Sequence, residues 1–174
     1  MPDATAAVVR GVAPAALRAH GVEAVLVGTA HLVSRPGAGV VAAAGGIHAF
    51  MGWSGPVLSD SGGYQVFSLL AGQRRLASVT DAGLTFRFSP KQRARRLTPR
   101  SCIETQLRLG ADVIYCLDYC THPDAPAHEQ ERSVELTLRW AAECRATFDR
   151  AVGDGPRPLL FAVVQGGREK QLRT

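Results

Sequence analysis

Three polar side chains follow apolar runs that resemble the ends of buried strands: Asp60, Asp118 and Gln165. A carboxylate can give or take a proton, and an amide can both donate and accept hydrogen bonds. In parallel strands of one sheet, residues that follow the carboxyl ends meet at one edge. The spacing therefore predicts one site that contains all three side chains.

One kind of chemistry that fits a pair of carboxylates at such an edge is hydrolysis of a sugar, with Asp60 and Asp118 as paired acids. That interpretation leaves the turn Gln165-Gly166-Gly167 unexplained. Asp60 also has a purely structural alternative, in which its carboxylate caps the turn by accepting from the amides of Gly62 and Gly63.

The elements that position these residues alternate between strand and helix. Thr98-Pro99 is typical of a helix start, with Thr as the cap and Pro at the first position, and Gly110 ends that helix. The apolar runs lack polar alternation, which is typical of parallel strands buried on both faces. The patterns predict strands at 22–27, 56–60, 112–117 and 159–164, a short strand at 8–12, a hairpin around 84–88, a loop at 153–158 and helices at 14–20, 98–110 and 128–150.

This order predicts an α/β fold, either an open doubly wound sheet or a (β/α)8 barrel. The three polar strand ends favour the barrel, because active sites of barrels lie at that mouth. A complete barrel needs about 250 residues, and the chain has 174. We therefore expect residues 1–174 to form the first half of a TIM barrel, with an inserted hairpin.

The composition fits a folded protein of the cytoplasm. Hydrophobic residues make up 46% of the chain, and the net charge is +5, which suits an anionic partner such as RNA. The four cysteines form no C-x-x-C pair, so we expect reduced thiols and no metal site in this chain. No apolar segment is long enough to span a bilayer, so no membrane association is expected.

Several motifs occur in one order along the chain. They are Thr29-x-His31-Leu32, Phe50-Met51-Gly52-Trp53, Asp60-Ser61-Gly62-Gly63-Tyr64-Gln65-Val66-Phe67, Asp118-x-Cys120-Thr121, Ser133-x-Glu135-x-x-x-Arg139-Trp140 and Val164-Gln165-Gly166-Gly167. In this order they resemble the tRNA-guanine transglycosylases, and the resemblance covers the chain from about Val8 to its end.

The resemblance implies a base-exchange reaction on tRNA. In the family, a carboxylate expels guanine from the anticodon wobble position, a 7-deazaguanine replaces it, and a second carboxylate manages the protons. Asp60 resembles that second carboxylate, the proton acceptor. The residues that resemble the family's base-binding set are Ser61, Gly62, Gly63, Tyr64, Asp118, Gln165 and Gly166.

Within that set, Asp118 would bind the Watson–Crick edge of the purine, and Gln165 would read its O6. Tyr64 would stack on the base, and core packing is the structural alternative for this ring. The basic run of Lys91, Arg93, Arg95 and Arg96 is a candidate contact to the tRNA backbone. A solvated basic loop remains open for these four residues.

The chain also departs from the family. Gly28 and Ala30 flank Thr29 where the family usually has Asn and Tyr, and Tyr119 stands where bacterial members commonly carry Glu. The nucleophilic Asp and the zinc-binding cysteines of family members lie further on, so we expect zinc and a homodimer only in a full-length form. We expect the 174-residue chain alone to show no exchange and to bind no stoichiometric zinc.

Two hypotheses remain within the family. The chain belongs to an active transglycosylase, or it is a non-catalytic tRNA-binding partner or a remnant. Retention of Asp60, Asp118 and Gln165 favours the enzyme, because a pure partner has no reason to keep a base pocket.

Overall fold

The structure, a computed structural model, describes residues 1–154 and 157–173, without the side chain of residue 74. The chain forms a four-stranded parallel sheet in the order β1-β2-β6-β7 and a separate three-stranded antiparallel sheet in the order β3-β4-β5. The strands are β1 Val25–Val27, β2 Val57–Ser59, β3 Ala77–Thr80, β4 Gly83–Phe86, β5 Arg95–Leu97, β6 Val113–Tyr115 and β7 Leu159–Phe161.

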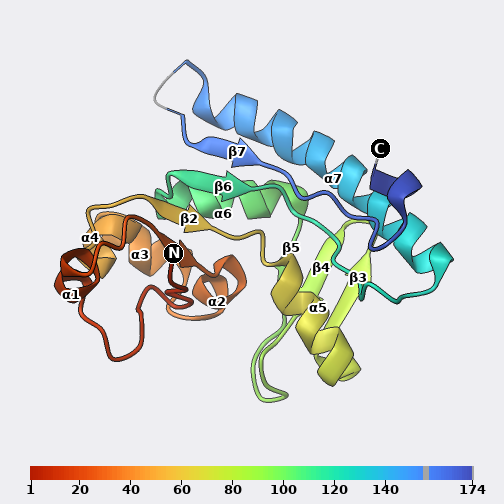
Figure 1. The fold of residues 1–174 in the computed structure, drawn as a ribbon, viewed down its shortest axis with the longest axis horizontal. Helices are drawn as coiled ribbons and strands as arrows, with labels where there is room; N and C mark the ends of the chain where they lie inside the picture. The colour runs from red at the N-terminus through yellow and green to blue at the C-terminus, as the bar shows by residue number, and fades with distance from the viewer. Residues whose placement is uncertain (155–156, 174) are drawn as a thin grey trace.

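Helices connect the parallel strands, as an α/β fold requires. Figure 1 shows the first four helices gathered toward one end of the molecule and the small sheet, with α5, toward the other. The α-helices are α1 Pro14–Ala19, α2 Thr29–Ser34, α3 Ala38–Ala43, α4 Ile47–Met51, α5 Gly63–Gly72, α6 Pro99–Leu109 and α7 Ala127–Val152, and the 3-10 turns are η1 Arg74–Leu76 and η2 Lys170–Arg173.

The two faces of the parallel sheet differ in burial. One face carries Val27 and Ile114, which are fully buried in cores that the helices complete. On the other face, pairing places Leu26, Leu58, Val113 and Leu159 in one row across the four strands. The first three residues of this row are only half-buried, and Leu159 is 59% exposed. The helices therefore cover one face of the sheet and leave the other open.

The small sheet is fastened to the longest helix, α7. The indole Nε1 of Trp140 donates to the backbone oxygen of Asp81, in the turn between β3 and β4, at 2.8 Å. Arg139 forms an ion pair with the Asp81 carboxylate at 3.3 Å. Trp140 is fully buried in the core that α6 and α7 share, so this turn is attached to the main body of the protein.

The structure confirms the α/β class, the parallel strands, the hairpin beside the main sheet and the helices that begin at Pro14, Pro99 and Ala127. The prediction of a strand at 8–12 is wrong. Val8 makes only an isolated bridge to Thr5, and the chain then turns at Gly11, whose φ is +74°. Part of the loop expected at 153–158 lies outside the described residues.

The four helices α2 to α5 are not predicted by the sequence pattern. Three of them, α2 to α4, are only five or six residues long, so they lack the repeated apolar spacing that identifies a helix. In α5, the residues Gly62-Gly63 were expected to form only a turn. Gly62 is instead the N-cap of a ten-residue helix, with a φ of +85°.

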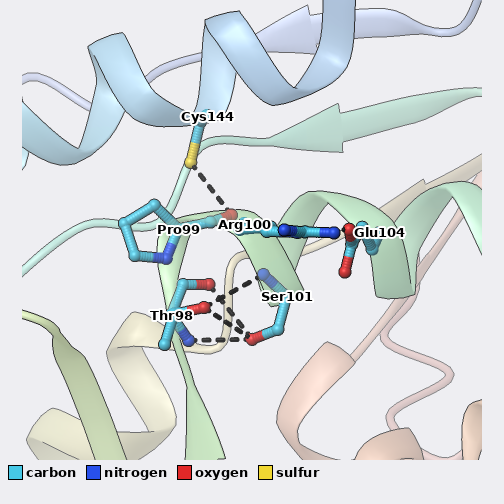
Figure 2. Close-up of polar contacts among 6 residues, drawn as sticks. All are labelled: Thr98, Pro99, Arg100, Ser101, Glu104 and Cys144. Carbon is cyan, nitrogen blue, oxygen red and sulfur yellow. Dashed lines mark hydrogen bonds and ion pairs between the residues drawn. The ribbon is translucent and has the colours of Figure 1, made fainter. Parts of the chain in front are cut away.

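Helix α6 begins with a reciprocal cap, which Figure 2 shows. The Thr98 hydroxyl accepts from the backbone N–H of Ser101 at 3.1 Å, and the Ser101 hydroxyl accepts from the backbone N–H of Thr98 at 2.8 Å. The thiol of Cys144, on α7, donates to the backbone oxygen of Pro99 at 3.5 Å. The first turn of α6 is thus fixed both locally and by its neighbour helix.

We expect Thr98→Ala to lower the free energy of unfolding by about 1 kcal/mol, because the first turn of α6 loses the acceptor for the Ser101 amide. Urea unfolding measures this change. Thr98→Ser is the matched control, because it keeps the hydroxyl and should be close to wild type. Equal stability of all three proteins would contradict a stabilising cap.

Candidate active site

The carboxyl ends of three parallel strands open into one cavity of about 440 Å³. Asp60 follows β2, Asp118 follows β6, and Gln165 follows β7. All three line the cavity, as the sequence predicted. The cavity lies on the open side of the sheet, because Leu26 of the open face is also part of its wall. The other lining residues include Ser61, Gly62, Tyr64, Gln65, Tyr115, Cys120 and Val163.

Asp118 is buried, with 5% of its surface exposed, and each carboxylate oxygen has a donor. Ser61 Oγ donates to Oδ1 at 2.5 Å, and Gln165 Nε2 donates to Oδ2 at 2.8 Å. Burial raises the pKa of Asp118, while these two hydrogen bonds oppose the rise. The donors come from the ends of β2 and β7, so three strands together fix this carboxylate.

Gly63 gives Asp118 the room it occupies. A Cβ at position 63 would lie only 2.7 Å from the Asp118 backbone oxygen and would also collide with its carboxylate. The Asp118 carboxylate is fixed by its hydrogen bonds to Ser61 and Gln165. A larger residue at position 63 would therefore displace the carboxylate and break these bonds. Glycine is required here by close approach.

Asp60 is held on the opposite side, by groups that follow β1 and begin α5. Its Oδ1 accepts from the backbone N–H of Thr29 at 2.8 Å and from that of Gly62 at 3.1 Å. Its Oδ2 accepts from Gln65 Nε2 at 2.8 Å. Burial nevertheless raises the pKa of Asp60 to about 6, because desolvation outweighs the three hydrogen bonds. A carboxyl with this pKa can exchange protons near neutral pH.

The structure bears out half of the structural alternative for Asp60, in which its carboxylate caps the turn at Gly62 and Gly63. Asp60 does accept from the Gly62 amide, as a turn cap would, but the Gly63 amide donates to Ser61 Oγ at 3.0 Å. Asp60 also lines the cavity. Capping and a chemical role are therefore compatible in this geometry.

Gln65 has an unused acceptor beside Asp60. Among the described residues, its Oε1 is the buried side-chain oxygen without a hydrogen-bond partner. Its Nε2 faces Asp60 Oδ2. If the amide turned over, Oε1 would accept a proton carried by Asp60. Gln65 can thus serve either protonation state of the carboxyl.

The remaining predicted residues have different environments. Tyr64 is 64% exposed at the cavity, so core packing is the wrong alternative for this ring. Gly166 is buried against Leu172, and its placement beside a base remains a prediction. The basic residues are all exposed, two on the β4–β5 loop, which projects from the small sheet (Figure 1), and two on β5. They are Lys91 and Arg93 on the loop and Arg95 and Arg96 on β5.

Two residues at Asp60, Thr29 and Gln65, belong to the family-like motifs, but the sequence alone predicts no role for either. Their contacts to Asp60 depend on a backbone amide and on the start of a helix that was not expected. Spacing offers a partial signal for Gln65, which lies one helical turn beyond the Gly62 cap.

The described residues contain no group of three or more His, Cys, Asp or Glu side chains that could hold a metal ion. The cysteines are all free, and three of them are buried. Among the described residues, no helix combines the length and apolar character needed to cross a membrane.

The raised pKa of Asp60 makes a prediction for stability. Between its ordinary value of 3.8 and about 6, the folded protein holds a proton that the unfolded chain releases. The free energy of unfolding should therefore fall as pH rises through this window, by at most about 3 kcal/mol for this group. Asp60→Asn should remove the contribution of Asp60 to the pH dependence of the free energy of unfolding. The site can accommodate this change, because the Gln65 amide can turn over and accept from the new Asn amide.

Urea unfolding at pH 4 and pH 7 tests this expectation. Asp118 contributes a dependence of the same sign in both proteins, so the wild-type slope must be compared with that of the variant. Asp154→Asn, on an exposed loop, is the control. Identical slopes for wild type and Asp60→Asn would show that Asp60 has an ordinary pKa.

The profile of the family described as Queuine tRNA-ribosyltransferase matches residues 1–174. Similar curated relatives, each called queuine tRNA-ribosyltransferase, come from Cyanothece sp. at 43% identity, Novosphingobium aromaticivorans at 40% and Gloeobacter violaceus at 44%. The alignments cover 99% of this chain but only 43–45% of each relative, so the chain spans less than half their length. This chain belongs to the queuine tRNA-ribosyltransferase family.

Proposed function

We propose that this chain provides the base pocket and the proton acceptor of an enzyme that exchanges guanine at the tRNA wobble position for a 7-deazaguanine. The observation that carries the proposal is the pairing of two unlike carboxyls in one cavity. Asp118 is clamped by two donors, and Asp60 has a pKa near neutrality. The names of the relatives support the same reaction.

Asp118 suits the Watson–Crick edge of guanine. Guanine presents two adjacent donors there, N1–H and the exocyclic amine, and a carboxylate can accept from both. Ser61 and Gln165 keep the carboxylate facing the cavity while the base binds. The carboxamide of Gln165 would also read O6 of the base. The exposed ring of Tyr64 would stack on its face, worth roughly 1–3 kcal/mol.

Asp60 suits the proton transfer. With a pKa of about 6 it is largely ionised at neutral pH and ready to accept a proton. The incoming base must lose a proton as it bonds to the ribose carbon, and Asp60 would accept it. Gln65, with its free acceptor, would hold the protonated carboxyl afterwards.

We further propose that the four parallel strands are half of a (β/α)8 barrel. Two observations support this proposal: the three strand ends meet in one cavity, and one face of the sheet is open where the interior of a barrel would lie. The relatives are more than twice as long as the matched region. The nucleophilic carboxylate, the zinc site and a homodimer contact would belong to the full-length protein.

The exposed basic residues of the β4–β5 loop and β5 would contact the tRNA backbone. They concentrate positive charge in a chain whose net charge is +5. The alternative function within the family is a non-catalytic tRNA-binding partner or a remnant. The clamped Asp118 argues against it, because a partner without a base pocket has no use for a buried carboxylate that costs free energy to desolvate.

In the full-length protein, Asp60→Asn should abolish base exchange, because an amide cannot accept the proton. Binding of tRNA should be largely intact, since Asp60 lines the cavity and the basic residues do not. Incorporation of labelled guanine into tRNA measures exchange, and filter binding measures tRNA affinity. Asp154→Asn is the control and should exchange at the wild-type rate. Undiminished exchange by Asp60→Asn would remove Asp60 from its assigned role.

A further inference from the structure

Strands β2 and β6 separate just where the cavity begins. Their pairing joins Leu58 to Val113 and Ser59 to Ile114. One residue further along β6, the backbone of Tyr115 bonds to a side chain from α6 instead. Its N–H donates to Gln106 Oε1 at 2.8 Å, and its carbonyl accepts from Gln106 Nε2 at 2.8 Å. Gln106 thus takes the place of a strand at the point where β2 leaves the sheet.

Gln106 is also linked to the end of β2. Its Nε2 approaches the Cys102 sulfur at 3.1 Å, and the Cys102 thiol donates to the backbone oxygen of Ser61 at 3.4 Å. Both side chains are fully buried. A chain of contacts therefore runs from β6 through two α6 side chains to the residue whose hydroxyl holds Asp118.

Helix α6 is a fixed support for these contacts. Its first turn is held by the reciprocal cap of Thr98 and Ser101 and by the thiol of Cys144 on α7, as Figure 2 shows. Its last turn carries Leu109, which is fully buried in the core beneath β1 and β2. Gln106 and Cys102 therefore contact the two strand ends from a helix that is held at both of its own ends.

We infer that Gln106 is a positioning residue for the base pocket: it holds the ends of β2 and β6 at the separation at which Ser61 reaches Asp118. Gln106 itself lies behind the cavity wall and touches no ligand there. Asp60, which also follows β2, accepts its hydrogen bonds from Thr29, Gly62 and Gln65 and has none to Gln106. The role of the pocket in binding guanine rests on the proposed function.

Gln106→Leu tests the inference, because it removes both hydrogen bonds to Tyr115 at similar volume. In the full-length protein we expect the KM for guanine in tRNA exchange to rise about tenfold, the equivalent of about 1.4 kcal/mol. The kcat and the KM for tRNA should stay close to wild type, because Asp60 and the basic residues keep their contacts. A general loss of folding would instead reduce the amount of active enzyme. The apparent kcat would then fall while the KM for guanine stayed the same.

Ile47→Ala is the control, since it removes a fully buried side chain on α4, which takes no part in the contacts between β6 and Ser61. It should lower stability and leave the KM for guanine unchanged. If Gln106→Leu does not fold, Gln106→Asn serves instead, because its amide is one methylene too short to bridge Tyr115. A wild-type KM for guanine in a folded Gln106 variant would overturn the inference.

A crystal structure of the Gln106 variant separates this inference from the proposed function. We expect Ser61 Oγ and Asp118 Oδ1 to move out of hydrogen-bond distance. An unchanged contact would overturn the positioning role. If the wild-type protein neither binds guanine nor exchanges it, the proposed function fails, while the structure of the variant still decides what Gln106 does.

Discussion

The buried carboxylate of Asp118 imposes the constraint on which the rest of the site depends. A desolvated carboxylate is costly unless its oxygens receive hydrogen bonds. Ser61 and Gln165 supply them, so the ends of β2 and β7 must both reach the end of β6. This requirement accounts for the central place of β6 between its two partners and for the glycine at position 63.

The two carboxyls of the cavity differ because their supports differ. Asp118 accepts its hydrogen bonds from two side chains, Ser61 and Gln165. Asp60 is held mainly by backbone amides, from Thr29 and Gly62, which cannot move without moving β1 or α5. Environments that separate the behaviour of two acids allow one to bind and the other to exchange protons.

Much of this architecture could be predicted from the sequence. The continuous apolar runs identify the parallel strands, and Thr98-Pro99 marks the start of α6, because these signals are local. The convergence of Asp60, Asp118 and Gln165 follows from strand polarity alone. The contacts of Gln65 and Gln106 could not be predicted, because each depends on where a helix lies relative to a strand end. Short helices such as α3 owe their form to packing, so composition did not identify them.

The attachment of the small sheet has a consequence for how the family can vary. The turn at Asp81 is bound to α7 through Trp140, and β5 runs directly into the capped start of α6. The loop between β4 and β5 is at the opposite end of the hairpin from that turn, with residues 90–94 exposed. Insertions, deletions and charge changes can therefore accumulate in this loop without disturbing the cavity. The fold thus separates a segment whose sequence is free to vary from a pocket whose sequence is not.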